Sequence, residues 1–317
     1  MRLAFLGNGD FGVPTLRALL SSDHSLEALV TRPDRPSGRG RTPKPTPTKE
    51  IALSADLPVI EIEDLKDTEV PQKLSQPEVD LWVVVAFPII PAPLLQIPPL
   101  GTVNLHASLL PRYRGAAPVQ RAIMAGEERT GVTTFFIDAG VDTGAICRQQ
   151  EVDIEPGETS GELSARLSHI GAQLMLETLA MVRSGDPPRA PQDAALASPA
   201  PRLSKEEGRL IWSEDARTLV NRIRGTNPWP GAFTFAAGER LLVHRADPIA
   251  AGEVPWTGEV EPGTVAAFTD DGSPIVAAGD GGGVVLLELQ RGGRKASSGA
   301  DVSRGLRWRG GEQLRDD

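Results

Sequence analysis

The chain has 317 residues, of which 40% are hydrophobic and 24% charged, and its net charge is −9. This length suits about two domains of ordinary size, and the acidic balance argues against a general nucleic-acid-binding protein. The single cysteine, Cys147, excludes an internal disulfide and fits a reducing compartment. The longest apolar run, Leu81 to Ile90, contains Pro88 and is too short for a membrane span of about 20 residues. We therefore expect a cytoplasmic protein without a membrane partner.

The first half of the chain alternates between strand and helix patterns. Arg2–Gly7 reads as a buried strand, Val13–Leu20 as an amphipathic helix and Ser25–Thr31 as a second strand, which together form one unit of a parallel sheet. Further strands are predicted over residues 58–62, 79–86, 101–106, 130–137 and 145–152, and helices over 48–55, 65–74, 92–96, 119–125 and 159–183. The last helix begins with a capping box, Thr159 and Glu162. The expected fold is α/β, with a Rossmann-like, mostly parallel sheet.

The turn after the first strand formally matches a dinucleotide-binding fingerprint, with glycines at positions 7, 9 and 12. That fingerprint needs an acidic residue near the end of the second strand to hold a ribose. Thr31 and Arg32 stand there instead. A tight turn that lets the helix pack closely on the sheet is therefore favoured over NAD binding.

Two segments carry local positive charge. Arg32 to Pro47 contains five prolines and cannot form a helix or an inner strand, so it is expected to be a long exposed loop. Its arginines suit phosphate groups, although solvated loops are the usual location of charge runs. The second basic segment is Arg291 to Arg309.

A change in composition separates two domains. Ser184 to Arg202 is rich in Pro, Ala and Ser and has no apolar period, which is typical of a linker. We place the first domain at residues 1–188, the linker at 189–205 and the second domain at 206–317. In the second domain Ser213 is expected to cap a helix, and short strands near 232–235, 240–244, 263–267, 275–278 and 284–289 predict a small β-barrel. The five-stranded oligonucleotide-binding (OB) barrel is one such fold.

A candidate site follows the strand that ends near residue 106. Asn104 and His106 are two apart on this strand, so their side chains share one face, while Leu105 points into the core. Ligands bind at the carboxyl ends of strands in open parallel sheets. Asp142 lies in a later loop and supplies a carboxylate. Each residue alone could be a turn former or a structural residue, but an amide, an imidazole and a carboxylate together suit acyl transfer to an amine.

Four rare strings place the chain beside a known family. NLHASLLPRYRGAAPVQ (104–120) and GVDTGAI (140–146) resemble the folate-dependent formyltransferases. With TRPDRPSGRGR (31–41) and NPWPGAF (227–233), the whole chain resembles the branch of this family that formylates methionyl-tRNA. Two departures affect the shape of the expected folate pocket: Phe87-Pro88 stands where the family often has Tyr-Gly, and Ala107 replaces a common Gly.

The resemblance implies a reaction and the residues that carry it. The expected reaction transfers the formyl group of 10-formyltetrahydrofolate to the amino group of methionine on initiator tRNA. Asn104 is expected to stabilise the oxyanion, His106 to carry the proton and Asp142 to orient the imidazole. The folate pocket would be lined by Phe87, Pro88, Ile89, Ser108, Leu109, Leu110, Pro111 and Asp138. The tRNA would be bound by Arg32, Arg35, Arg39, Arg41, Lys44, Arg294 and Lys295, with help from an OB-like second domain.

Other functions remain open at this point. No metal site is expected, because the four histidines are scattered, and the protein is expected to be a monomer. The main alternative is a formyltransferase that acts on an amino-sugar nucleotide; the basic loop after Thr31 argues against it, since a small sugar needs no such arm. Glycinamide ribonucleotide enzymes resemble only the first domain. A non-catalytic RNA-binding module and a dehydrogenase are less favoured.

Overall fold

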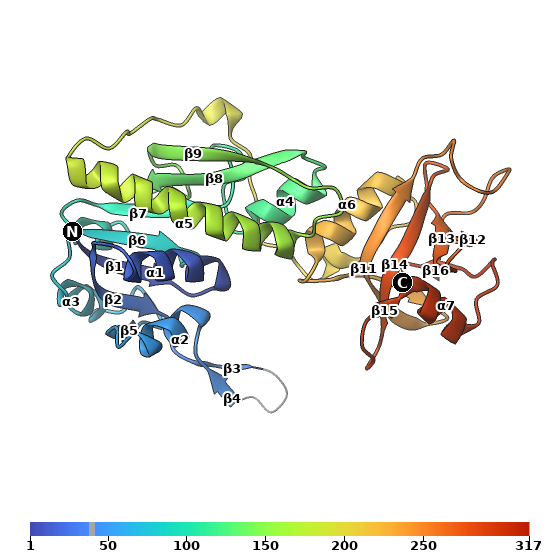
Figure 1. The fold of residues 1–317 in the computed structure, drawn as a ribbon, viewed down its shortest axis with the longest axis horizontal. Helices are drawn as coiled ribbons and strands as arrows, with labels where there is room; N and C mark the ends of the chain where they lie inside the picture. Colours follow the sequence, from blue (N-terminus) through green and yellow to red (C-terminus); the bar gives the residue numbers. More distant parts are fainter. Residues whose placement is uncertain (38–41, 317) are drawn as a thin grey trace. The chain divides into compact units, whose positions relative to one another are not determined.

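The computed structural model describes residues 1–37 and 42–316, which divide into two compact units (Figure 1). The first unit comprises residues 1–118, 129–152 and 164–200, and the second comprises residues 119–128, 153–163 and the chain from Pro201 onward. Two residues expected to bind tRNA, Arg39 and Arg41, lie outside the described residues.

A seven-stranded, mostly parallel sheet forms the centre of the first unit, as predicted. Its strand order is β5-β2-β1-β6-β7-β8-β9. The strands are β1 (Arg2–Gly7), β2 (Ser25–Thr31), β5 (Val59–Glu61), β6 (Leu81–Val85), β7 (Thr102–His106), β8 (Arg129–Phe136) and β9 (Ile146–Asp153). The first five strands in this order run parallel, and β8 is antiparallel to β7. All five residues of β6 are buried, as expected for the middle of a parallel sheet.

Helices lie on both sides of this sheet (Figure 1). They are α1 (Val13–Leu20), α2 (Pro47–Ser54), α3 (Val70–Ser75) and α5 (Ser160–Ser184), with 3₁₀ turns at Asp10–Gly12 and Leu94–Gln96. The helix α4 (Pro118–Met124) belongs to the second unit from Val119 onward. The helix predicted over residues 65–74 was expected to be broken or capped near Pro71, and α3 begins at Val70, because proline fits the first turn of a helix but not its interior. The expected helix over 92–96 is only a 3₁₀ turn.

The approach of α5 to the sheet determines which face of β7 is free. A Cβ placed on Gly171 of α5 would lie 2.6 Å from the Leu105 side chain, so the helix packs directly on that residue. Leu105 is 3% exposed. Since side chains alternate along a strand, Asn104 and His106 point away from this contact, as the sequence predicted.

The basic segment after β2 contains a short hairpin that was not predicted, β3 (Arg35–Ser37) paired with β4 (Thr42–Lys44). Pro36 stands opposite Pro43, which a two-stranded ribbon tolerates because each strand has a free edge. The start of the segment is tied to the turn after β1. Asn8 accepts hydrogen bonds from the Thr31 hydroxyl and the Arg32 N–H, both at 2.9 Å.

The second unit is a small antiparallel barrel preceded by a helix, as predicted. The helix is α6 (Ala216–Thr226), and the sheet order is β12-β13-β14-β11-β10-β16, with β15 beside β14. The elements are β10 (Ala232–Ala236), β11 (Glu239–Ile249), β12 (Val265–Phe268), β13 (Pro274–Ala277), β14 (Gly283–Arg291), β15 (Ser297–Ser298), α7 (Gly299–Leu306) and β16 (Leu314–Arg315). Two 3₁₀ turns, Ala194–Leu196 and Glu206–Gly208, precede α6. The sheet curls until its edges meet, because the Leu314 N–H donates to the Gly263 carbonyl and the Val265 N–H to the Glu312 carbonyl, both at 2.8 Å.

Two details of this unit differ from expectation. Ser213 does not cap α6; the Asp215 carboxylate does, accepting a 2.8 Å hydrogen bond from the Thr218 N–H. The helix α7 was not predicted. The barrel core is apolar and buried, with Trp212, Leu219 and Leu286 among its members.

The predicted capping box is present at the start of α5. The Glu162 carboxylate accepts a 2.9 Å hydrogen bond from the Thr159 N–H, and the Thr159 hydroxyl accepts a 3.3 Å bond from the Glu162 N–H. The hydrogen bond from the Thr159 N–H, followed by those that the Thr159 hydroxyl and the Arg245 guanidinium donate to the carboxylate, holds the pKa of Glu162 below its ordinary value.

Thr159→Ala should therefore lower the free energy of unfolding by about 1 kcal/mol in urea denaturation, because one N–H of the first turn loses its acceptor. Thr68→Ala, at an exposed threonine, should leave it unchanged. Since the pKa of Glu162 is depressed by folding, Glu162→Gln should cost stability at pH 7, and the difference should shrink as the pH falls below about 4.5. Equal stability of wild type and Thr159→Ala would contradict the assignment.

Candidate active site

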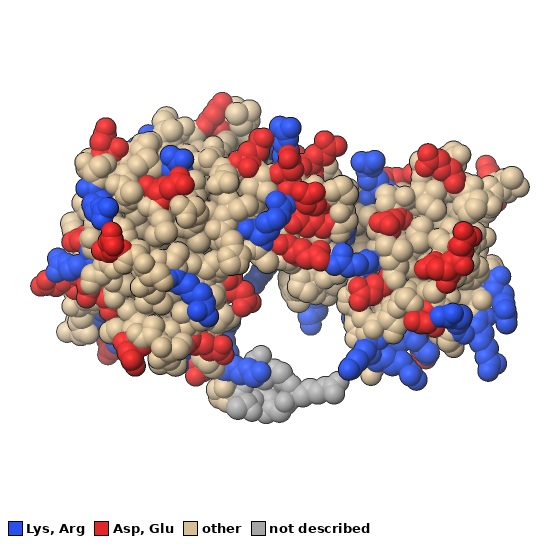
Figure 2. Space-filling model, viewed as in Figure 1, with Lys and Arg blue, Asp and Glu red and all other residues tan. Residues whose placement is uncertain are grey.

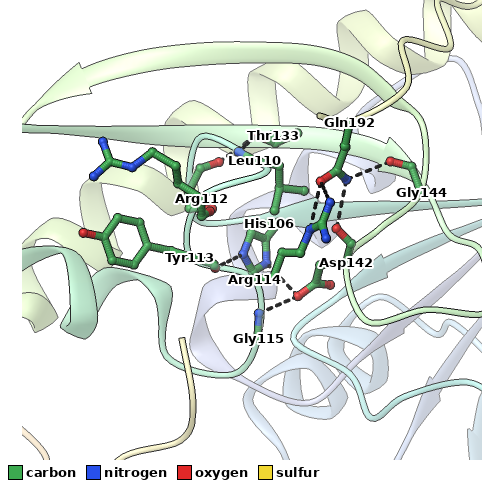
Figure 3. A network of polar contacts seen from close by, with 11 residues as sticks. His106, Leu110, Arg112, Tyr113, Arg114, Gly115, Thr133, Asp142, Gly144 and Gln192 are labelled. Carbon is green, nitrogen blue, oxygen red and sulfur yellow. Dashed lines mark hydrogen bonds and ion pairs between the residues drawn. The ribbon is translucent and has the colours of Figure 1, made fainter. Parts of the chain in front are cut away.

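His106 ends β7 and is only 6% exposed. Its Nε2 lies 2.8 Å from the Tyr113 carbonyl oxygen. A carbonyl can only accept, so Nε2 carries the hydrogen of the neutral ring and Nδ1 carries the lone pair. Nδ1 lies 3.7 Å from Oδ2 of Asp142 (Figure 3). The imidazole therefore has one free basic nitrogen, and that nitrogen faces a carboxylate.

Asp142 reaches this position from the loop between β8 and β9. Its Oδ2 also accepts a 2.8 Å hydrogen bond from the Gly115 N–H, in the turn that follows His106 (Figure 3). The backbone of Asp142 is left-handed, with φ of 53°. This conformation is uncommon for a residue other than glycine, and it persists where the surrounding contacts enforce it. The structure thus brings His106 and Asp142 together.

Asn104 is half-buried on β7, on the face of the strand that carries His106. Within the described residues its side-chain amide has no hydrogen-bond partner in the protein. A half-buried amide on this face is available to donate a hydrogen bond to a bound ligand.

The turn after His106 is held by internal hydrogen bonds. The Ser108 hydroxyl donates to the Arg112 carbonyl at 2.7 Å. The Thr133 hydroxyl of β8 donates to the Ser108 carbonyl at 2.6 Å and accepts from the Leu110 N–H at 3.2 Å. Ser108 and Leu110 are buried, and their polar groups are used inside the turn; Leu109 and Pro111 are half-exposed. Of these four residues, all expected to contact folate, Leu109 and Pro111 have accessible surface.

The remaining residues expected to bind folate lie on two other loops. Phe87 packs partly against the core, whereas Pro88 and Ile89 are exposed after β6, and Ile89 is 72% exposed. The Asp138 carboxylate accepts hydrogen bonds from the Gly140 N–H (3.0 Å) and the Thr143 hydroxyl (2.6 Å), so it shapes its own loop. Val141, which the sequence did not single out, is 49% exposed beside Asp142. Large exposed apolar side chains of this kind are available for a ligand.

The described residues expected to bind tRNA belong to both units. Arg32 and Lys44 are exposed in the first unit, where Arg35 pairs with Glu63 at 2.8 Å. In the second unit, Arg294 and Lys295 line a cavity of about 360 Å³ together with Arg291, Ser297 and Val302. Figure 2 shows Lys and Arg gathered on this part of the unit, around β15 and α7.

One segment of the site had no signal in the sequence. Residues 190–200, which composition assigned to a linker, run beside the turn after His106. The Arg114 N–H donates to the Ser198 carbonyl at 2.8 Å, and the Ala200 N–H donates to the Arg114 carbonyl at 2.6 Å. The Ser198 hydroxyl accepts from the Tyr113 N–H at 2.9 Å. Backbone pairing of this kind requires no particular residue type, so composition cannot reveal it.

Other reactive groups are not arranged for chemistry. Burial raises the pKa of Cys147 to about 11, so its thiol stays protonated near neutrality and is a poor nucleophile. Over residues 1–37 and 42–316, no group of three or more His, Cys, Asp or Glu side chains is placed to hold a metal ion. In the same ranges no helix is long and apolar enough to cross a membrane.

Two known domain families match the chain. Residues 1–179 match the family model described as formyl transferase, and residues 202–307 match the model described as formyl transferase, C-terminal domain. The chain belongs to the formyl transferase family. Its resemblance to folate-dependent formyltransferases, inferred from short strings of sequence, is thereby confirmed.

Individual members of the family are similar over most of the chain. A methionyl-tRNA formyltransferase of Moorella thermoacetica is 47% identical over 82% of this chain and 85% of its own length. One of Symbiobacterium thermophilum is 44% identical over 93% of this chain and 89% of its own. Among solved structures, the N-formyltransferase of Helicobacter canadensis in complex with folinic acid and dTDP-3-aminofucose has a TM-score of 0.64 at 17% identity, covering 91% of this chain and 98% of that one. The last likeness shows a shared fold alone.

Proposed function

We propose that this formyl transferase moves the formyl group of 10-formyltetrahydrofolate onto the amino group of methionine carried by initiator tRNA, in the cytoplasm. The observation that carries the choice of substrate is similarity at 44–47% identity, over most of the chain, to proteins named methionyl-tRNA formyltransferase. The chemistry rests on Asn104, His106 and Asp142.

The described residues fit a folate that donates a formyl group. A pterin is planar and suits apolar walls with a few polar groups. Ile89, Val141 and Pro111 supply accessible apolar surface, and Asn104 supplies an unpartnered amide. The folate provides a formyl carbon bonded to a nitrogen, and that carbon–nitrogen bond breaks during transfer.

His106 handles the proton of the incoming amine. An ammonium group cannot attack a carbonyl carbon, so the methionine amine attacks as the free base after releasing one proton to water, and its nitrogen must lose a second proton once the new carbon–nitrogen bond has formed. Nε2 is occupied by the Tyr113 carbonyl, which leaves Nδ1 as the basic atom. A proton taken at Nδ1 makes the ring positive, and Asp142 at 3.7 Å stabilises that charge. The same proton is then available for the nitrogen that leaves.

Asn104 acts on the formyl oxygen. Negative charge develops on this oxygen as the amine attacks, and a fixed amide N–H lowers the barrier by donating a hydrogen bond to it. Because no described protein group uses the Asn104 amide, its donor is free when substrate arrives.

The alternative, transfer to an amino-sugar nucleotide, is not favoured. The two relatives described above, which are similar over most of the chain, are named for methionyl-tRNA, as are others, whereas the sugar-bound structure is only 17% identical. The experiment that tests the choice is a transfer assay with labelled 10-formyltetrahydrofolate and either initiator Met-tRNA or amino-sugar nucleotides. We expect label on Met-tRNA; label on the sugar alone would overturn the proposal.

His106→Ala and Asp142→Ala should each reduce turnover by about 10²–10⁴-fold, the range of general acid–base catalysis. Asn104→Ala should cost about 10²–10³-fold, as loss of an oxyanion donor does. The matched control is His169→Ala, at an exposed histidine of α5. Turnover is measured on variants whose thermal unfolding matches wild type. A variant with wild-type turnover would remove that residue from the mechanism.

Arg294→Ala and Lys295→Ala should weaken tRNA binding and make it less sensitive to salt. Each phosphate contact releases counterions, so each lost contact should lower the slope of log affinity against log salt by about 1. Turnover at saturating tRNA should stay near wild type. Arg17→Ala, at an exposed arginine of α1, serves as control. Unchanged slopes in both variants would show that this cavity does not contact tRNA.

A further inference from the structure

We propose that Gln192 is a positioning residue that holds the Asp142 carboxylate in place beside His106. Gln192 lies outside every motif noted in the sequence, in the largely irregular segment between α5 and α6. The inference concerns the same site as the proposed function and rests on it.

The side-chain amide of Gln192 makes four hydrogen bonds (Figure 3). Its Nε2 donates to the carbonyl oxygens of Asp142 and Gly144, both at 2.8 Å. Its Oε1 accepts from Nε and Nη2 of Arg114, at 3.0 and 2.7 Å. These four bonds use both hydrogens and both lone pairs of the amide. Such complete use is typical of a fixed structural bridge.

The bridge joins the two loops that carry the site. Asp142 and Gly144 belong to the loop between β8 and β9, and Arg114 belongs to the turn after His106. The Arg114 backbone is itself fixed, because its N–H and carbonyl are bonded to Ser198 and Ala200. Gln192 therefore ties the loop that carries Asp142 to the turn after His106.

The Asp142 loop needs this support. Asp142 has a left-handed backbone, which costs an ordinary residue free energy unless the surroundings enforce it. The path of the loop is constrained at Gly144, because the chain there passes close to β8. A Cβ on Gly144 would lie 1.7 Å from the Phe136 carbonyl oxygen. Gln192 donates hydrogen bonds to the carbonyls of Asp142 and Gly144, which lie on either side of Thr143. Within the described residues, the Asp142 carboxylate itself contacts the Gly115 N–H and Nδ1 of His106, so Gln192 acts on it through the backbone of the loop.

Glutamine is the residue type that this position requires. A glutamate would keep two acceptors for Arg114 but would place a carboxylate oxygen against two carbonyl oxygens, which repel it. Gln192→Glu therefore separates the two halves of the bridge. It retains the contact with Arg114 and breaks the contact with the Asp142 loop.

The first experiment measures kcat and KM for formyl transfer in Gln192→Ala and Gln192→Glu, with Gln150→Ala as the control at an exposed glutamine of β9. We expect kcat to fall by about 10–100-fold in both Gln192 variants with KM values near wild type, since a small misplacement of a catalytic group has this scale of effect. Gln150→Ala should match wild type. Wild-type kcat in both Gln192 variants would overturn the proposal. If Gln192→Ala does not fold, Gln192→Met keeps the shape without the polar groups.

A double-mutant cycle decides whether Gln192 acts through Asp142. In an Asp142→Asn background, which leaves the backbone carbonyls in place, Gln192→Ala should change kcat less than threefold. An effect of the same size as in wild type would assign Gln192 a merely structural role and overturn the proposal.

Hydrogen exchange tests the same contact without turnover. The Gly115 N–H should exchange faster in Gln192→Ala than in wild type, because its acceptor Asp142 is released, while core amides such as that of Leu105 should be unchanged. Unaltered exchange at Gly115 would contradict the proposal. If wild type forms no formylmethionyl-tRNA, the proposed function fails, and this exchange measurement still tests the bridge.

Discussion

The site depends on one carboxylate that is shared between two loops. Asp142 accepts the Gly115 N–H at 2.8 Å and faces Nδ1 of His106 at 3.7 Å, so it fixes the turn after β7 and the imidazole at its start. Neither partner is near Asp142 in the sequence. In the proposed mechanism this carboxylate stabilises the positively charged ring and orients the nitrogen that carries the proton. If Asp142 were displaced, a protonated His106 ring would have no negative charge beside it.

The fold supplies this geometry through ordinary packing. Leu105 is pressed against Gly171 of α5, which turns the neighbouring side chains of β7 to the other face of the sheet. The end of β7 then presents His106 where ligands bind in open parallel sheets. The loops that follow β6, β7 and β8 carry the residues of the proposed folate pocket. Exposed apolar residues such as Ile89 and Val141 lie on these loops rather than in the core.

Regular patterns predicted the regular parts of the molecule. Apolar runs predicted the strands β1 and β6. The alternation of side chains along a strand predicted that Asn104 and His106 share one face, and the capping box predicted the start of α5. The contact between His106 and Asp142 was expected only through resemblance, because periodicity carries no information on where a loop returns. The hydrogen bonds between residues 190–200 and the turn after His106 were not predicted for a similar reason. Backbone pairing requires no particular residue type, and a segment rich in Pro and Ala is typical of a linker. The cap of α6 was assigned to Ser213 because serine and aspartate are equally good caps.

The most direct measurement is a crystal structure of the protein with a stable analogue of the formyl donor. The account predicts that the formyl oxygen lies within hydrogen-bond distance of the Asn104 amide, about 2.7–3.2 Å, with the His106 and Asp142 pair beside the formyl carbon. A folate that binds away from β7 would contradict it. So would a bound complex in which Asp142 has turned away from His106.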